Sequence, residues 1–142
     1  MSRLSLISAF FAAICTFFSV GAANAGWLLS DHEARYCEDE LILASISERF
    51  RHQTHNVPHL PHVGITDFYN IHEHRYLAYR EDRPIARRYC GATVVLTNGH
   101  RREIWYLIED GMGFVGIGDH VEFCVSGFDR WMVYNGACRV LR

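Results

Sequence analysis

The chain shows three different spacings of apolar residues. A nearly unbroken apolar run covers residues 4–20, apolar positions recur every three to four residues between 30 and 51, and from residue 65 onward they recur about every second residue. A period near 3.6 is that of an α-helix, and a period of two is that of a β-strand. Two prolines and a glycine exclude regular structure from the intervening residues 51–64. The pattern predicts a helix, a loop and then strands.

The predicted helix opens with a capping signal. Ser30 and Glu33 have the spacing of a capping box, and acidic residues in the first turn suit the helix dipole. The apolar residues on its inner line are Tyr36, Leu43 and Phe50. We expect one amphipathic helix of about five turns from Ser30 to about Arg51, with Cys37 in its first half.

Turn signals divide the rest of the chain into strands. Asn98-Gly99 is a hairpin signal, and residues 111–118 form a glycine-rich turn. The predicted strands are Ile65–Tyr69, Glu73–Arg80, Ala86–Thr97, Arg102–Glu109, Val121–Ser126 and Trp131–Leu141, the last interrupted at Asn135-Gly136. The predicted fold class is α+β, with one N-terminal amphipathic helix followed by a curled antiparallel sheet of about four to six strands. This is the layout of cystatin-like folds, a likeness that implies no function.

Alternation within the hairpin assigns side chains to two faces. One face is predicted to carry Cys90, Ala92, Val94, Leu96, Trp105 and Leu107. The other is predicted to carry Tyr89, Thr93, Val95, Ile104, Tyr106 and Ile108. Neither face is polar, so we expect the sheet to be covered on both sides. One helix covers one side, which leaves the other to loops, to the sheet's own curl or to another molecule.

Residues 1–25 have the three parts of a secretory signal peptide. Arg3 supplies the charge, Leu4–Val20 the apolar core and Ala23-Asn24-Ala25 the cleavage site. A transmembrane anchor fits less well, because serines and a threonine interrupt the apolar run. We therefore expect a single mature domain of residues 26–142 that is periplasmic or secreted, with no stable membrane span after cleavage.

Four of the five cysteines remain after this cleavage: Cys37, Cys90, Cys124 and Cys138. An even number of cysteines in a small exported domain is typical of disulfides, whereas zinc sites use closer spacings. We expect two disulfides. The favoured pairs are Cys37–Cys90 and Cys124–Cys138, because the latter two cysteines lie on neighbouring terminal strands; the other two connectivities stay open.

Charge and composition exclude several function classes. All fourteen basic residues are arginine, and the formal net charge is -2. Without lysine the chain has neither a Schiff-base nucleophile nor a P-loop lysine. The lack of a basic excess argues against nucleic-acid binding. A G-x-G-x-x-G run at residues 111–116 is followed by a strand, so it does not predict a dinucleotide site, and no cofactor is expected.

Six of the nine histidines lie close together in the sequence: His52, His55, His59, His62, His72 and His74. The favoured interpretation is that they are solvated residues of a loop. The alternative is weak binding of zinc or copper, since imidazole is a common ligand of both metals. An envelope enzyme with an unrecognised carboxylate site, for example one that uses Glu109-Asp110, is a further alternative without a catalytic motif to support it.

The preferred functional interpretation is a binding or interaction module. Arginine, tyrosine and tryptophan dominate binding hot spots. Guanidinium groups also bind the carboxylates of acidic polymers, and aromatic rings stack on sugars. The candidate surface consists of Tyr89, Thr93, Tyr106, Ile108, Arg88 and Arg102. The expected partner is an envelope protein or polymer, and a homodimer is also open.

Several segments resemble a known family. They include PIARRYC at residues 84–90, WYLIEDGMGF at 105–114, VEFCVSGFDRW at 121–131 and NVPHLPHVGI at 56–65. They resemble an uncharacterised family of small exported proteins from rhizobia and related alphaproteobacteria, over nearly all of the mature chain. The resemblance implies export and disulfides, and it transfers no catalytic or binding residue.

Overall fold

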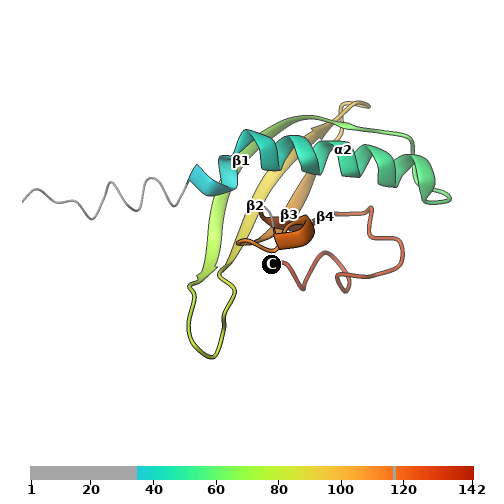
Figure 1. Cartoon of the computed structure of the whole chain (residues 1–142). Coiled ribbons are helices and arrows are strands. Elements are labelled where there is room, and N and C mark those ends of the chain that lie inside the picture. The colour runs from blue at the N-terminus through green and yellow to red at the C-terminus, as the bar shows by residue number, and fades with distance from the viewer. Residues whose placement is uncertain (1–34, 117) are drawn as a thin grey trace, which may run out of the picture.

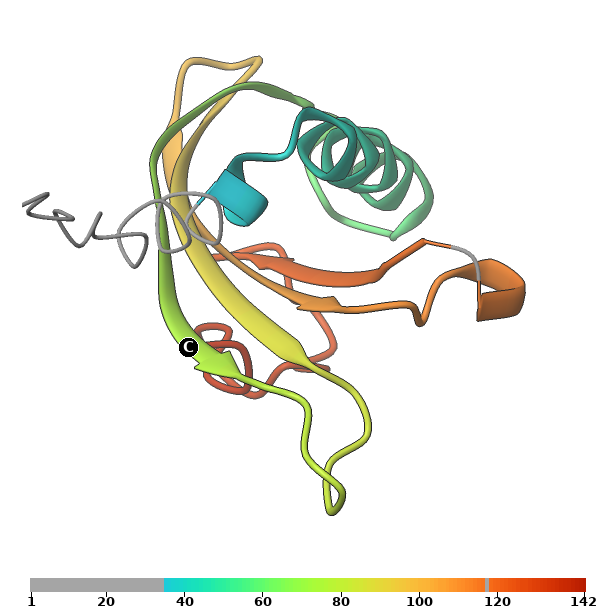
Figure 2. The same cartoon turned by 60° about the vertical axis from the view of Figure 1, so that its left-hand side comes forward.

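One long helix lies across a four-stranded antiparallel sheet in the computed structural model, which describes residues 35–116 and 118–142 (Figure 1). The elements are η1 (Arg35–Glu38), α2 (Glu40–Asn56), β1 (Ile65–Leu77), β2 (Arg87–Leu96), β3 (Arg101–Glu109), η2 (Phe114–Gly116) and β4 (His120–Val125). The strands follow one another in sequence order, β1-β2-β3-β4. Figure 2 shows the sheet curling around the helix. The predicted α+β class is confirmed.

The helix begins later and ends later than its sequence pattern predicts. Asp39 is its N-cap: the side chain accepts hydrogen bonds from the backbone N–H groups of Leu41 (2.9 Å) and Ile42 (3.2 Å). The capping box predicted at Ser30 lies outside the described residues. Cys37 therefore belongs to η1, and α2 continues past Arg51 to Asn56.

The first strand is longer than predicted. Ile65–Tyr69 and Glu73–Arg80 were expected as separate strands, but β1 is continuous through residues 65–77. Its pairing with β2 shifts register at three places. Such bulges insert residues without ending a strand, and they increase its bend. The interruption in the apolar pattern therefore marks bulges in one curved strand.

The β2–β3 register corrects the predicted faces. Cys90 pairs with Tyr106 and Gly91 pairs with Trp105, so Trp105 lies on the face opposite Cys90. The prediction assumed a two-residue loop at Asn98-Gly99. The Leu96 N–H instead bonds to the His100 carbonyl, which makes a three-residue loop with Gly99 in a left-handed conformation. One extra loop residue moves every side chain of a strand to the other face relative to its partner.

The sheet is covered on both sides. Ile46, Phe50, Ile104 and Tyr106 are among the buried residues between α2 and the inner face. The outer face carries a second apolar cluster: Leu107, Cys124, Cys138 and Leu141, with Tyr89, Trp105 and Tyr134 against it. The covering segment on the outer side is the chain's own C-terminus, which answers the question left open by the two apolar faces.

The C-terminal segment is not the predicted strand Trp131–Leu141. It runs through successive turns. Met132, Asn135, Ala137 and Cys138 have φ values between 53° and 59°. Left-handed backbone at four nearby positions is incompatible with a strand. The turns let this segment fold back over the outer face.

Both disulfides join the favoured pairs. The Cα atoms of Cys37 and Cys90 are 5.9 Å apart, and those of Cys124 and Cys138 are 5.7 Å apart. The first disulfide holds η1 against the inner face, and the second holds the C-terminal segment against β4. Over the described part of the chain, no helix has the length and apolarity needed to cross a membrane.

Candidate functional site

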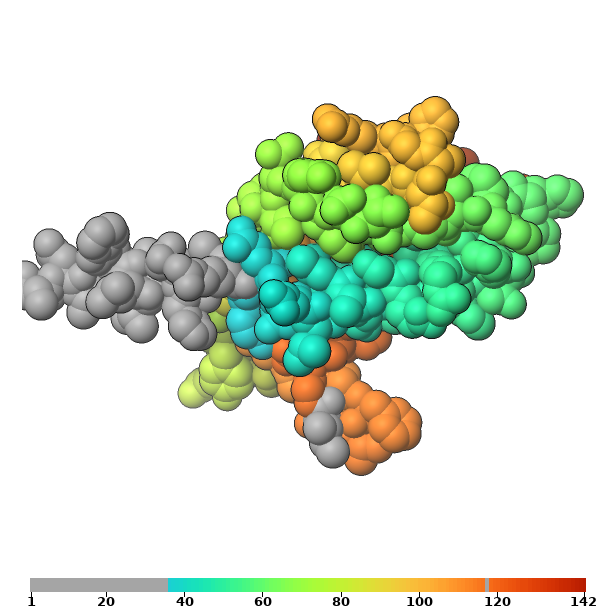
Figure 3. All heavy atoms as spheres, turned by 90° about the horizontal axis from the view of Figure 1, so that it is seen from above, coloured from blue at the N-terminus to red at the C-terminus, as the bar shows by residue number. Residues whose placement is uncertain are grey.

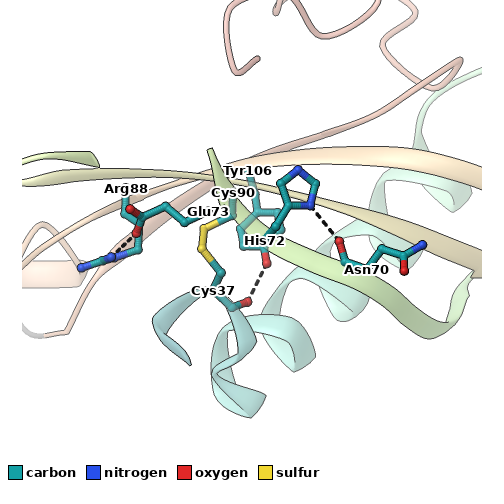
Figure 4. The surroundings of a disulfide bond; sticks show 7 residues. All are labelled: Cys37, Asn70, His72, Glu73, Arg88, Cys90 and Tyr106. Carbon is teal, nitrogen blue, oxygen red and sulfur yellow. Dashed lines mark hydrogen bonds and ion pairs between the residues drawn. A yellow bond between two sulfur atoms is a disulfide. The ribbon is translucent and has the colours of Figure 1, made fainter. Parts of the chain in front are cut away.

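Half of the surface proposed from sequence is buried. Tyr106 and Ile108 are fully buried beneath α2, and the Tyr106 hydroxyl donates to the Cys37 carbonyl at 2.5 Å (Figure 4). Arg88 is only 4% exposed and forms an ion pair with Glu73. The prediction was wrong for these three residues, because the hairpin register places Tyr106 and Ile108 on the inner face with Arg88.

The other three candidates do not form one surface. Tyr89 lies on the outer face, where the Arg75 guanidinium is 3.6 Å from the centroid of its ring. Thr93 shares that strand and face, four residues further along. Arg102 is exposed near the start of β3 and pairs with Val94, a residue of the inner face. The six predicted residues are therefore divided between two faces.

The six clustered histidines separate into three places. His52 and His55 belong to α2, His59 and His62 to the following loop, and His72 and His74 to β1. The rings of His55 and His62 stack with centroids 4.8 Å apart. Within residues 35–116 and 118–142, no three His, Cys, Asp or Glu side chains come together as a metal site.

His72 and His74 share a face, as their spacing predicted. Both rings meet the Trp105 ring edge-on, with centroids 6.1 Å and 5.1 Å away. Burial, followed by the nearby charges of Arg75 and His72, lowers the pKa of His74. The pair contributes to the outer apolar cluster through these ring contacts.

The acids Glu109 and Asp110 have different surroundings. Glu109 pairs with Arg87 at 2.7 Å. Burial, and then the charge of Asp119, raises the pKa of Asp110. Asp119 itself accepts hydrogen bonds from the Tyr36 hydroxyl at 2.5 Å and from the Gly111 N–H at 3.0 Å. This cluster ties the turn at residues 111–118 to η1.

The described residues form a groove that sequence reasoning did not find. It has a volume of about 520 Å³ and lies between the second half of α2, β4 and the C-terminal segment. We call it the α2 groove. It is lined by Glu48, Arg49, His52, Gln53, Val57, Phe123, Trp131, Val133 and Tyr134. A smaller pocket of about 60 Å³ shares six of these residues and adds Cys124, Val125, Phe128, Asp129 and Arg130.

Two side chains of α2 fix the groove to the edge of the sheet. Arg49 Nη1 donates to the Val121 carbonyl at 2.5 Å, and its guanidinium lies 5.3 Å from the Phe123 ring centroid. Gln53 Nε2 donates to the Phe128 carbonyl at 3.1 Å. These bonds hold α2, β4 and the C-terminal segment in a defined arrangement, with a guanidinium beside an aromatic wall.

The wall of the groove opposite α2 is a hydrogen-bonded turn that exposes apolar side chains. Trp131 is 65% exposed and Val133 is 68% exposed. The Asp129 carboxylate accepts from the backbone N–H groups of Val133 and Tyr134, each at 2.8 Å. Met132, which lies between Trp131 and Val133, has a left-handed backbone conformation with φ 53°. The two hydrogen bonds to the Asp129 carboxylate help to offset the cost of that conformation.

The sequence did contain a signal for this wall. Residues 126–136 include Ser, Gly, Asp and Asn at short intervals, which is the composition of turns. The aromatic and aliphatic residues among them outweighed that signal and suggested a strand. The groove depends on the contact between Gln53 and Phe128, which are 75 positions apart in the chain. The spacing of residues along the sequence does not predict such a contact.

Comparisons with protein-family models, with curated proteins and with solved structures found no match to this chain.

Proposed function

We propose that this protein is an exported binding module and that the α2 groove is its recognition site. The observation that carries the proposal is a groove of about 520 Å³ whose lining includes the exposed Trp131, on a turn that Asp129 closes through hydrogen bonds. Ligand sites typically have about 300–1,000 Å³ and mostly apolar walls with a few polar groups. The signal-like residues 1–25 and the two disulfides support export to the periplasm or beyond.

The chemistry of the walls favours an aromatic or large aliphatic side chain from a partner protein. Val57, Phe123 and Trp131 provide apolar and ring surfaces. Burial, and then the charge of Glu122, raises the pKa of Tyr134, so its phenol is a neutral hydrogen-bond donor at pH 7. The groove offers a place for one ring and a donor at its side.

The charges beside the groove favour an acidic group next to that ring. Glu48 is paired with Arg51 at 2.6 Å. Arg49 lines the groove, and Arg130 lines the smaller pocket beside it together with Asp129, whose oxygens accept hydrogen bonds from backbone amides. We therefore propose as ligand a protein segment that carries an aromatic residue close to a carboxylate.

The test is an NMR titration of the ¹⁵N-labelled protein with N-acetylphenylalanine and with its amide. We expect shifts at the Trp131 indole, the Gln53 side-chain amide and the Val133 amide. The carboxylate form should bind more tightly than the amide, and Arg49→Gln should remove that difference. Trp131→Ala should abolish the shifts.

Tyr79→Ala is the matched control, because Tyr79 is an equally exposed aromatic residue that does not line the groove. It should leave the titration unchanged. Shifts confined to other surfaces, or no shifts at about 50 mM ligand, a concentration that detects even binding weaker than about 4 kcal/mol, would show that the α2 groove is not a recognition site.

A further inference from the structure

A second exposed apolar feature lies in the turn between β3 and β4. Phe114 is 91% exposed, Val115 78% and Met112 46%. We call these three residues the loop tip. Figure 3 shows this orange segment standing out from the body of the molecule. Contiguous apolar side chains at such exposure usually mark an interaction site.

The loop tip is held in place by its own hydrogen bonds. The Gly113 N–H donates to the Gly118 carbonyl, and the Gly116 N–H to the Gly113 carbonyl, each at 2.9 Å. Asp119 bonds to both Gly111 and Tyr36 at its base. The loop tip therefore presents its apolar side chains from a fixed base, which lowers the entropy lost when it binds.

The backbone of the loop tip is strained. Val115 has φ 58°, a left-handed conformation that a β-branched residue rarely adopts. Such strain persists only where the surroundings enforce it, and it concentrates at functional positions. An exposed loop that is strained and also apolar is costly in the isolated molecule, and an interface would offset part of that cost.

We propose that the loop tip of one molecule inserts Phe114 into the α2 groove of a second copy. This inference rests on the proposed function of the groove and names its partner. The ligand inferred above is an aromatic residue close to a carboxylate. Phe114 is such a residue, because Asp110 and Asp119 flank it and no basic residue occurs between them.

The charges of the two surfaces are complementary. Asp110 and Asp119 lie half-buried at the base of the loop and give it negative charge. Arg49 lines the groove and Arg130 lines the smaller pocket beside it, and Glu48 of the groove is paired with Arg51. Opposite charges at the rim of an interface favour encounter and fix orientation. A second copy therefore matches the groove in apolar character and in the sign of its charge.

The size of the contact predicts weak association. A buried phenylalanine contributes about 150–250 Å², and three loop-tip side chains stay near the lower class of interfaces, below about 1,200 Å² in total. Because the contact joins two different surfaces, either two reciprocal contacts close a dimer or the assembly grows head to tail. We expect monomers at low concentration and larger species at high concentration.

Sedimentation velocity of the mature, disulfide-bonded protein from about 10 μM to about 1 mM tests this, a range that spans the affinities of weak interfaces. The wild type should associate as concentration rises. Phe114→Asp and Trp131→Asp should each weaken association about tenfold or more. Tyr79→Asp, at an exposed aromatic residue outside both surfaces, should have no effect.

Mixing the Phe114→Asp and Trp131→Asp proteins tests directly whether the loop tip binds the groove. The Phe114→Asp protein keeps an intact groove and the Trp131→Asp protein keeps an intact loop tip, so together they should form a 1:1 complex. The Phe114→Asp protein mixed with the double variant should form none. A monomeric wild type at about 1 mM, or no complex in the mixture, overturns the proposal. If N-acetylphenylalanine still binds the groove in that case, the proposed function stands and the partner is not a second copy.

Discussion

At the scale of single residues, the outer face depends on the absence of a side chain at Gly91. A Cβ atom there would lie 2.7 Å from Cζ3 of Trp105 and 2.9 Å from Nε2 of His72. Both distances are shorter than van der Waals contact. The Arg142 guanidinium lies 5.3 Å from the centroid of the same Trp105 ring. Gly91 therefore leaves room beside the strand for the side chains of Trp105 and His72, and Arg142 at the C-terminus packs against Trp105.

We predict that Gly91→Ala destabilises the protein by about 1–3 kcal/mol, the usual cost of overpacking. The added methyl group would displace Trp105 and His72 from the strand. Urea unfolding with the disulfides intact measures the change. Gly64→Ala is the control, because its nearest neighbouring atom would be 3.6 Å away; equal losses in the two variants would contradict this account.

Residue types in the sequence foretold part of the site. Tryptophan and arginine were expected to contribute to binding by residue type, although Trp131 itself was assigned to a strand, and two disulfides followed from the cysteine count. Burial did not follow in the same way. Arg88 was expected at a surface, yet it lies between the rings of Tyr36 and Tyr76, 5.0 Å and 4.4 Å from their centroids. The burial of an arginine by residues far away in the sequence cannot be predicted until the positions of those residues in the fold are known.

At the scale of elements, the α2 groove has a second wall because of the turn that Asp129 closes with the backbone amides of Val133 and Tyr134. One carboxylate bonds to two consecutive backbone amides, and left-handed residues lie next to both. A hydrogen bond to a charged group contributes about 1.5–3 kcal/mol. The turn therefore stays closed without a regular strand or helix to support it.

We predict that Asp129→Ala opens this turn, speeds hydrogen exchange at the amides of Val133 and Tyr134, and lowers stability by about 1–3 kcal/mol. Asp129→Asn keeps one acceptor oxygen and should have an intermediate effect. Asp67→Ala, at an exposed carboxylate on β1, is the control. Unchanged exchange at both amides in Asp129→Ala would mean that the disulfide alone closes the turn.

At the scale of the whole molecule, each disulfide fastens a different layer. Cys37–Cys90 closes a loop of 53 positions on the inner side of the sheet, and Cys124–Cys138 closes 14 on the outer side. Loop-closure entropy then assigns about 4 kcal/mol to the first and about 3 kcal/mol to the second. The two bonds have similar energies and different structural consequences.

We predict that the Cys37→Ala/Cys90→Ala variant loses more stability than the Cys124→Ala/Cys138→Ala variant in chemical denaturation. The second variant should nevertheless lose more ligand binding, because its C-terminal segment supplies Trp131, Val133 and Tyr134 to the groove. Dye binding to the outer face should also rise in that variant only. Retention of groove binding there would separate the groove from the second disulfide.

By itself the sequence determined the α+β class, the body of the helix, the main strands and the two disulfides. These depend on the spacing of apolar residues and cysteines along the chain, which is a local property. Only the tertiary structure decided which face of the hairpin is buried, because one residue in the Asn98-Gly99 loop moves a whole strand between faces. The tertiary structure likewise decided that the C-terminal segment covers the outer face and forms the groove with α2, because those contacts join residues far apart in the chain.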